Sequence, residues 1–335
     1  MKMTVWKFLP EQYRTLPKPE TYAPSLAGKV VIITGANVGL GLEAAKHLAT
    51  MNPERLILAC RDPKKAQRAV SDIQKVTGVK SIETWQLDIS SNASVKAFAD
   101  KFAKEGGGKL DILIENAGVN VPKLERTPDG WEKNIGVNHL GTSHLAFRML
   151  PHLLQAPQPR LVILASDVHY FTKQPELMNR PDLLQSLNKD KPANKFEAFD
   201  GIQRYDISKT MNVLWGRVLA RHIPFSSPLT VSTVNPGFCV SALLRDQPIG
   251  LRIFASLVGR TTEVGSRTIV HAAVAPQVQG KTGVYFSSCE EAEPSDFVIS
   301  KAGGETEEKL WTETIRILGK VDPEVPRIVQ TYLSC

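Results

Sequence analysis

Apolar strand-like segments alternate along the chain with segments in which apolar residues recur every three or four positions. The strand-like segments are short and nearly continuous runs of Val, Ile and Leu, without polar alternation. Such runs are typical of a parallel sheet that is buried on both faces. The predicted strands are KVVIIT (29–34), RLILAC (55–60), SIETWQL (81–87), KLDILIE (109–115), RLVILAS (160–166) and LTVSTVN (229–235). The predicted helices cover 39–51, 63–76, 91–105, a long segment ending near residue 152, and 203–220.

This order of elements predicts the α/β class, with a Rossmann-type doubly wound parallel sheet and helices on both of its faces. We expect a single domain over 28–290, with an N-terminal extension over 1–27 and a C-terminal extension over 291–335. The segment 171–203 is rich in Pro, Lys and Asn, so we expect an insertion that loops out over the sheet.

Composition narrows the classes of function. The 335 residues are 42% hydrophobic and 22% charged, which is ordinary for a globular protein. The net charge of +7 is spread along the chain, and it favours an anionic small ligand over nucleic acid. No apolar run of about 18 residues and no secretory signal appear, so we expect no transmembrane segment and a cytoplasmic location. The four cysteines are scattered, which indicates neither a disulfide framework nor a metal site.

The stretch TGANVGLG (34–41) lies at a predicted turn from a strand to a helix. Its glycines at 35, 39 and 41 allow a tight turn and a close approach of the backbone to a pyrophosphate, which the helix N-terminus would also attract. The spacing G-x-x-x-G-x-G differs from the common G-x-G-x-x-G fingerprint. The next strand ends in Cys60 and is followed by Arg61 and Asp62. Because Arg61 suits a 2′-phosphate and Asp62 comes one position late for a ribose hydroxyl, we favour NADP(H) over NAD.

A second set of signals follows the third, fourth and fifth strands. Asp88, in LDI, could accept a hydrogen bond from an adenine amino group. Small or turn-prone residues close the fourth strand in ENAG (115–118), as a strand end beside a nucleotide requires. In YDISK, Tyr205 and Lys209 lie four residues apart and so share one face of a helix.

Taken in order, these motifs resemble the short-chain dehydrogenase/reductase family over about 28–290. The similar stretches are TGANVGLG, LDI, NAG, VNHLG, the strand ending in Ser166, YDISK and NPG (235–237). LACRD, VNHLG and YDISK are most similar to the NADP-dependent branch that resembles retinol dehydrogenases. LWTETIRILG, near the C-terminus, resembles the terminal helix of related microbial biosynthetic reductases.

The resemblance implies a set of catalytic roles. Tyr205 would be the general acid/base, and Lys209 would lower its pKa and hold the nicotinamide ribose. Ser166 would bind the substrate carbonyl, and Asn138 would hold a water that connects Lys209 to solvent. The predicted contacts to NADP(H) are Gly35, Asn37, Val38, Gly39, Leu40, Gly41, Arg61, Asp88, Ile89, Asn116, Ala117, Gly118, Tyr205, Lys209, Pro236 and Gly237.

The sequence departs from the family pattern in three places. Ser166 and Tyr205 are 39 residues apart, so the intervening insertion must loop out and return. Glu115 stands where the first of two asparagines is usual. ASDVH replaces the commoner double serine before His169, which we interpret as a loop histidine.

The segment after NPG, residues 238–259, is apolar and corresponds to a mobile substrate lid in the family. It could equally be an amphipathic helix that covers the core. We therefore expect a reductase for a small carbonyl compound, or the reverse reaction on its alcohol, with a lipophilic or biosynthetic substrate. Two alternatives stay open: a cofactor-binding member with a non-redox role, and an enzyme whose N-terminal Trp6, Phe8 and Leu9 contact a membrane surface. Monomer and homo-oligomer are both compatible with the sequence.

Overall fold

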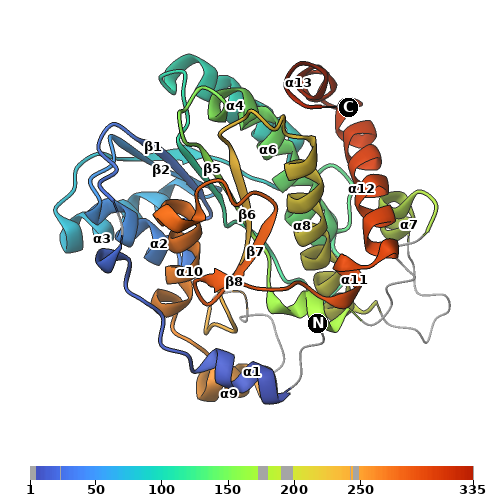
Figure 1. The fold of residues 1–335 in the computed structure, drawn as a ribbon, viewed down its shortest axis with the longest axis horizontal. Helices are drawn as coiled ribbons and strands as arrows, with labels where there is room; N and C mark the ends of the chain where they lie inside the picture. The colour runs from blue at the N-terminus through green and yellow to red at the C-terminus, as the bar shows by residue number, and fades with distance from the viewer. Residues whose placement is uncertain are drawn as a thin grey trace.

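The computed structural model describes residues 5–22, 24–172, 180–189, 199–241, 243 and 249–334. One eight-stranded sheet forms the centre, in the order β3-β2-β1-β4-β5-β6-β7-β8 (Figure 1). All neighbouring strands are parallel except β7 and β8, which pair antiparallel. The strands are β1 (Val30–Thr34), β2 (Arg55–Cys60), β3 (Ile82–Gln86), β4 (Ile112–Glu115), β5 (Arg160–Leu164), β6 (Thr230–Asn235), β7 (Val284–Ser287) and β8 (Glu290–Glu291). The predicted doubly wound fold is confirmed.

Helices cover both faces of this sheet. The α-helices are α1 (Val5–Gln12), α2 (Gly39–Thr50), α3 (Pro63–Thr77), α4 (Asn92–Glu105), α5 (Lys133–Ile135), α6 (Thr142–Leu153), α7 (Leu183–Lys189), α8 (Gly201–His222), α9 (Ile249–Val258), α10 (Thr262–Val274), α11 (Asp296–Ile299), α12 (Lys301–Gly319) and α13 (Glu324–Tyr332). Shorter helical turns include η1 (Pro19–Thr21), η2 (Gly136–Gly141), η3 (Asp167–Phe171) and η6 (Pro276–Val278).

The apolar strands divide their side chains between two cores. Val30 and Ile32 of β1 pack with residues of α4, α6 and α8, whereas Val31 and Ile33 pack with residues of α2, α3 and α10. All four side chains are buried, because successive residues of a strand point to opposite faces. This two-sided burial explains why the strands carry no polar alternation.

Helix α12, the last but one in the chain, lies against α8 and contributes to the core on that face (Figure 1). Trp311 of α12 stacks on Trp215 of α8, with ring centroids 5.5 Å apart. The same helix holds part of the insertion, because the carboxylate of Glu313 accepts hydrogen bonds from the backbone N–H groups of Leu183 and Leu184. Residues 173–179 and 190–198 of the insertion lie outside the described part of the chain. Helix α8, which carries Tyr205 and Lys209, is therefore held in place by its contacts with α12.

Because seven strands run parallel, their carboxyl ends gather at one edge of the sheet, where ligands bind in open α/β folds. The glycine-rich turn, the ENAG segment, Ser166 and the NPG segment all follow strands at this edge. None of the helices in the described ranges has the length and hydropathy that a membrane span requires.

Candidate active site

The glycine-rich turn connects β1 to α2. Gly35 and Gly39 have φ of 65° and 61°, in the left-handed region that side chains disfavour. Gly41 is required for a different reason: a Cβ there would lie 2.4 Å from Asn116 Nδ2 and 2.7 Å from the carbonyl oxygen of Gly35. Between them Val38 has extended backbone and caps α2 with an exposed side chain. The turn therefore places the N-terminus of α2 at the carboxyl edge of the sheet.

The end of β4 is fastened to this turn. Asn116 Nδ2 donates to the carbonyl oxygens of Thr34 and Gly35, at 2.8 and 3.2 Å. The backbone N–H of Ala117 donates to Thr34 Oγ1 at 2.9 Å. The structure thus brings Gly35, Asn116 and Ala117 together, as a shared nucleotide site requires.

The end of β2 presents a different set of groups. Cys60 is buried, and burial raises the pKa of its thiol to about 11, so it stays neutral. Asp62 caps α3 and accepts hydrogen bonds from the N–H groups of Lys64 and Lys65 at 3.0 and 3.1 Å. These bonds lower the pKa of Asp62, and they orient its carboxylate toward the N-terminus of α3. Arg61, between them, is exposed.

Asp88 and Ile89 follow β3. Asp88 Oδ1 accepts hydrogen bonds from the N–H and the hydroxyl of Ser90, at 3.0 and 2.7 Å. Ile89 lies under η2, where a Cβ on Gly141 would come within 2.0 Å of the Ile89 carbonyl oxygen. The glycine of VNHLG therefore permits close packing of η2 on the end of the third strand.

Asn138 lies in η2, a π-helical stretch within the longer helix. Its side-chain amide pairs with the backbone of Val119, donating to the carbonyl and accepting from the N–H, both at 2.8 Å. It also donates to Ser208 Oγ at 2.9 Å. These bonds hold the loop after β4 against α8, one residue from Lys209. Widened helical turns of this kind occur frequently at functional sites.

Lys209 is 4% exposed, and its Nζ donates to the carbonyl oxygen of Leu164 at 2.7 Å. Burial lowers the pKa of this ammonium to about 7. A Cβ on Gly118 would lie 3.6 Å from Lys209 Nζ and 3.1 Å from Asn138 Oδ1. Gly118 therefore leaves space beside both groups.

Tyr205 is half-buried, and the Lys209 Nζ lies 5.9 Å from the centroid of its ring. Burial is the largest cause that raises the pKa of Tyr205, and Asp167 and Asp206 raise it further, while a hydrogen bond with Ser166 acts in the opposite direction. Lys209 is not among the causes of this shift, so its expected lowering of the Tyr205 pKa stays a prediction.

Ser166 follows β5 and caps η3, where its Oγ accepts from the N–H of Val168 at 3.3 Å. The same Oγ donates to Asp167 Oδ1 at 3.1 Å. Sequence reasoning missed Asp167, which is buried and has a raised pKa because of that burial. The substitution of a serine by this aspartate in ASDVH was the available signal.

Asn235 is a second residue that the sequence did not single out. Its Oδ1 accepts from the N–H groups of Asp167 and Gly237, at 3.1 and 3.0 Å. Gly237 has a φ of 81°, and the carbonyl of Pro236 accepts from Arg260 at 3.4 Å. The NPG turn is thus joined through Asn235 to the backbone beside Ser166.

His169 and Glu115 are both buried near the site but differ in their hydrogen bonds. His169 is buried between the carbonyl of Ser166, 2.7 Å from Nδ1, and the N–H of Ser295, which donates to Nε2 at 3.1 Å. Burial lowers its pKa to about 4, so it is neutral, and the residue lies in the helical turn η3 where we predicted a loop. Glu115 is 2% exposed, and neither carboxylate oxygen has a hydrogen-bond partner among the described residues. Burial raises its pKa well above the ordinary value.

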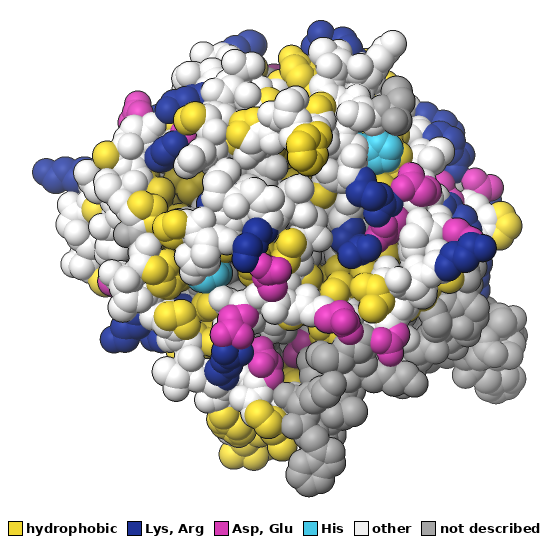
Figure 2. Space-filling model, viewed as in Figure 1, with side chains coloured by type: hydrophobic (Ala, Val, Ile, Leu, Met, Phe, Trp, Pro, Cys, Tyr) yellow, Lys and Arg dark blue, Asp and Glu magenta, His cyan; other side chains and the backbone are white. Residues whose placement is uncertain are grey.

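The segment 238–259 begins directly after the NPG turn, and its described residues are 238–241, 243 and 249–259. Within it, α9 is an apolar helix with three strongly exposed side chains: Ile249 at 68%, Ile253 at 55% and Leu257 at 74%. Figure 2 shows hydrophobic side chains gathered at the end of the molecule where α9 lies. Ala255 of the same helix is fully buried, so α9 also has a side that faces the protein, and both interpretations of the segment stay predictions.

Comparison with known proteins identifies related chains. A family model described as short chain dehydrogenase matches residues 29–175. The chain is 38% identical over 324 residues to the short chain dehydrogenase/reductase dmxR8 of Cryptosporiopsis, covering 93% of this chain and 96% of that protein. It is 35% identical over 298 residues to human retinol dehydrogenase 12, covering 88% and 87%. A solved short chain dehydrogenase from Shigella flexneri, complexed with NADP, superimposes with a TM-score of 0.58 at 22% identity, covering 79% and 98%.

Proposed function

The chain belongs to the short-chain dehydrogenase/reductase family of oxidoreductases, which use nicotinamide cofactors, and we propose that it reduces a ketone to a secondary alcohol with NADPH. The observation that carries the proposal is the meeting of Ser166, Tyr205 and Lys209 beside the glycine-rich edge of the sheet. A nicotinamide cofactor would supply the hydride that adds to the carbonyl carbon.

The residues that follow β2 favour NADPH over NADH in this proposal. Asp62, the only acid within two residues of Cys60, uses its Oδ1 to cap α3, which turns the carboxylate toward the helix N-terminus and away from the role of a ribose acceptor in this proposal. Arg61 is exposed beside it and can pair with a 2′-phosphate. The Shigella neighbour with NADP bound has the same fold and agrees with this choice.

The remaining residues that we propose as contacts for NADP(H) lie at the same carboxyl edge of the sheet. The turn at the N-terminus of α2 would bind the pyrophosphate, and the positive φ of Gly35 and Gly39 gives the turn its shape. The other residues of this turn are Asn37, Val38, Leu40 and Gly41. The space that Gly118 leaves open beside Lys209 suits the nicotinamide ribose. The other contacts would come from Asp88, Ile89, Asn116, Ala117, Pro236 and Gly237.

In the proposed reaction, Ser166 donates a hydrogen bond to the substrate oxygen, which requires its hydroxyl to turn away from Asp167. Tyr205 then donates its proton to that oxygen as negative charge develops on it. The raised pKa of Tyr205 means that the phenol carries its proton in the protein alone, so this proton is present when the carbonyl is bound. Lys209, with a pKa of about 7, can then pass a proton toward the phenolate, and Asn138 would hold the water that connects it to solvent.

The substrate we propose is a lipophilic small molecule, because the apolar segment 238–259 directly follows the NPG turn in the chain. A cytoplasmic location completes the proposal, since the three cysteines that the structure describes are free and buried, as in a reducing compartment.

The test is NADPH oxidation with a panel of aliphatic, aromatic and polycyclic ketones, followed by product analysis. We expect consumption of NADPH and equal formation of a secondary alcohol with at least one apolar ketone. Tight NADPH binding without turnover of any panel member would instead favour the non-redox alternative.

A further inference from the structure

Ser166 and Asp167 share a hydrogen bond whose direction decides what the serine can offer to a substrate. Ser166 Oγ lies 3.1 Å from Asp167 Oδ1, and it also accepts the backbone N–H of Val168 at 3.3 Å. A serine hydroxyl has one proton to donate and two lone pairs that accept. A carboxylate is a stronger acceptor than a neutral carbonyl oxygen. An ionised Asp167 therefore competes with the substrate for the one proton of Ser166.

The surroundings of Asp167 favour its neutral form. The residue is 6% exposed, and its backbone N–H donates to Asn235 Oδ1 at 3.1 Å, which fixes its place beside Ser166. Burial raises the pKa of Asp167, and this effect outweighs the lowering by the hydrogen bond with Ser166 and by Arg260. Among the described residues, Arg260 is the only cation that lowers this pKa.

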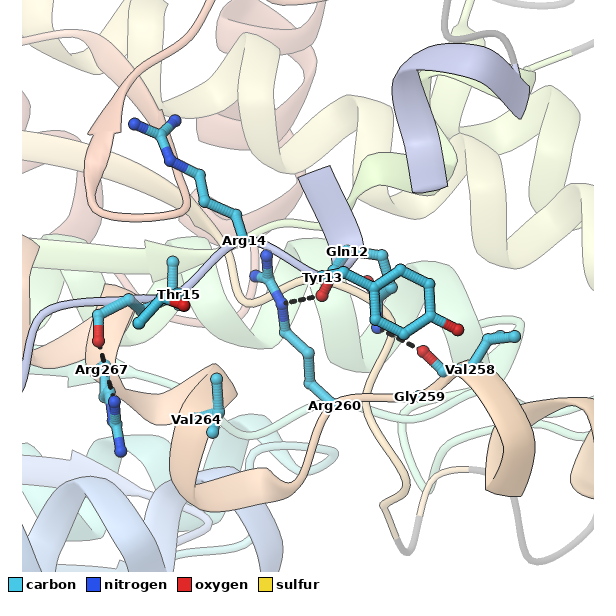
Figure 3. A pocket seen from close by; sticks show the side chains of 10 residues that line it. Gln12, Tyr13, Arg14, Thr15, Val258, Gly259, Arg260, Val264 and Arg267 are labelled. Atoms are coloured by element: carbon cyan, nitrogen blue, oxygen red, sulfur yellow. Dashed lines mark hydrogen bonds between the residues drawn. The ribbon is translucent and has the colours of Figure 1, made fainter. Parts of the chain in front are cut away.

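Arg260 acts on Asp167 without forming an ion pair with it, because its donors are used elsewhere. Its Nε donates to the carbonyl oxygen of Gln12 at 3.0 Å, and Figure 3 shows the guanidinium turned toward that residue. Its other nitrogens donate to the carbonyl oxygens of Pro236 and Glu11 and to Ser288 Oγ. The carboxyl of Asp167 is therefore left with Ser166 as its side-chain partner.

The other titratable side chains that face Asp167 are neutral near neutral pH. They are Tyr170 of η3, Tyr205 of α8, Cys239 and Tyr285 of β7, and in each burial is the first cause that raises the pKa. His169, two residues along the chain, is also neutral, because burial lowers its pKa to about 4. A change of charge beside Ser166 in mildly acidic to neutral solution therefore comes from Asp167 itself.

A proton on Asp167 reverses the bond to Ser166. The O–H of the carboxylic acid can donate to Ser166 Oγ, which already accepts the N–H of Val168. Both lone pairs of the serine are then used, and its own proton is the group that remains for the substrate oxygen. The hydrogen bond between Ser166 and Tyr205 would open as both hydroxyls turn to that oxygen.

We propose that Asp167 is a positioning residue whose acid form donates to Ser166, so that the serine proton is free for the carbonyl oxygen, and whose ionised form withdraws that proton. This inference rests on the proposed function, because it concerns the reduction of a carbonyl compound. Asp167 acts through Ser166 and does not touch the substrate. Reduction is therefore fast below the pKa of Asp167 and slows as pH rises through it.

The test compares kcat/KM of the wild type, Asp167→Asn and the control Asp206→Asn between about pH 5 and pH 9, with the panel ketone that the wild type reduces fastest. The asparagine amide can donate to Ser166 Oγ at every pH, so it imitates the acid form. The control is matched, because Asp206 is also buried and also raises the pKa of Tyr205, whereas Ser166 Oγ is bonded to Asp167.

We expect kcat/KM of the wild type to fall about tenfold per pH unit above the pKa of Asp167. Asp167→Asn should keep at least about half of the wild-type value at low pH and lack this fall. Asp206→Asn should keep the fall. A wild-type fall that Asp167→Asn retains, or that Asp206→Asn loses as well, would overturn the inference. A loss in Asp167→Asn at every pH would overturn it too, because it would indicate a merely structural role.

A second measurement does not depend on turnover. Carbon-13 NMR of the aspartate-labelled protein, assigned with Asp167→Asn, gives the pKa of Asp167, which should agree with the kinetic fall within about 0.5 pH unit. Ser166→Ala should raise this pKa by at least about 0.5 pH unit, because the hydrogen bond from Ser166 stabilises the carboxylate. An unchanged pKa in Ser166→Ala would overturn the inference. If the wild type reduces no ketone of the panel, the proposed function fails, and this titration still decides whether Ser166 and Asp167 are coupled.

Discussion

Replacement of Lys209 by methionine should make the protein more stable while it disables the site. Lys209 is 4% exposed, and burial lowers the pKa of its ammonium from 10.5 to about 7. The folded chain therefore disfavours the charged form that the unfolded chain carries at neutral pH. Methionine has a similar length and no charge, so it removes this penalty.

The size of the effect follows from the two pKa values. At pH 7 the difference between the two pKa values costs the folded state about 4 kcal/mol. Against this, the variant loses the hydrogen bond from Nζ to the Leu164 carbonyl, worth about 1 kcal/mol. That carbonyl keeps a partner, because Asn212 Nδ2 also donates to it at 3.0 Å. We expect a net gain of about 2 to 3 kcal/mol at pH 7.

The assay is urea unfolding without cofactor between about pH 7 and pH 9.5. In this range the unfolded wild type binds more protons than the folded one, so wild-type stability should rise with pH by up to about 1.4 kcal/mol per pH unit. The variant should lack this contribution, and the two curves should converge toward alkaline pH. Lys320→Met, at an exposed lysine, controls for general effects of the substitution. A Lys209→Met variant that is less stable at pH 7, or that keeps the wild-type pH slope, would refute the reasoning.

Two predictions concern Arg61 and Glu115. Arg61→Ala should reduce the preference for NADPH over NADH at least about tenfold, or about 1.4 kcal/mol, because it removes the partner of the 2′-phosphate; equal wild-type affinities for both cofactors, measured by titration, would contradict this. Glu115→Gln should stabilise the protein increasingly as pH rises from about 5, since the raised pKa of Glu115 makes wild-type stability fall as pH rises above the unfolded value of about 4.3. Thermal unfolding across that range decides, and a pH-independent difference would contradict the explanation.

The local pattern of apolar residues in the sequence was sufficient to predict most strands of the sheet. Val30 to Ile33 are all buried, alternately in two cores, and a strand covered on both faces produces such a continuous apolar run. The pattern was insufficient for β7 and β8, which have four and two residues. Segments of that length carry too few positions for a period to appear, and their pairing depends on the neighbouring β6.

The site was predictable where motif spacing alone places residues. Tyr205 and Lys209 share a face because they are one helical turn apart, and both reach the carboxyl edge of the sheet. The direction of the Tyr205 pKa was not predictable, because it depends on burial and on Asp167, which lies 38 positions earlier in the sequence. The contact of Arg260 with Gln12 joins residues 248 positions apart, and no local pattern indicates it.

The most direct test of the account is single-turnover reduction by Tyr205→Phe, with NADPH binding measured on the same sample. Phenylalanine keeps the ring and its packing but removes the proton that the substrate oxygen must receive. We predict that the rate of reduction falls at least about 10²-fold while NADPH affinity changes little. Near-normal reduction by a folded, cofactor-bound Tyr205→Phe protein would contradict the assignment of Tyr205 as the acid.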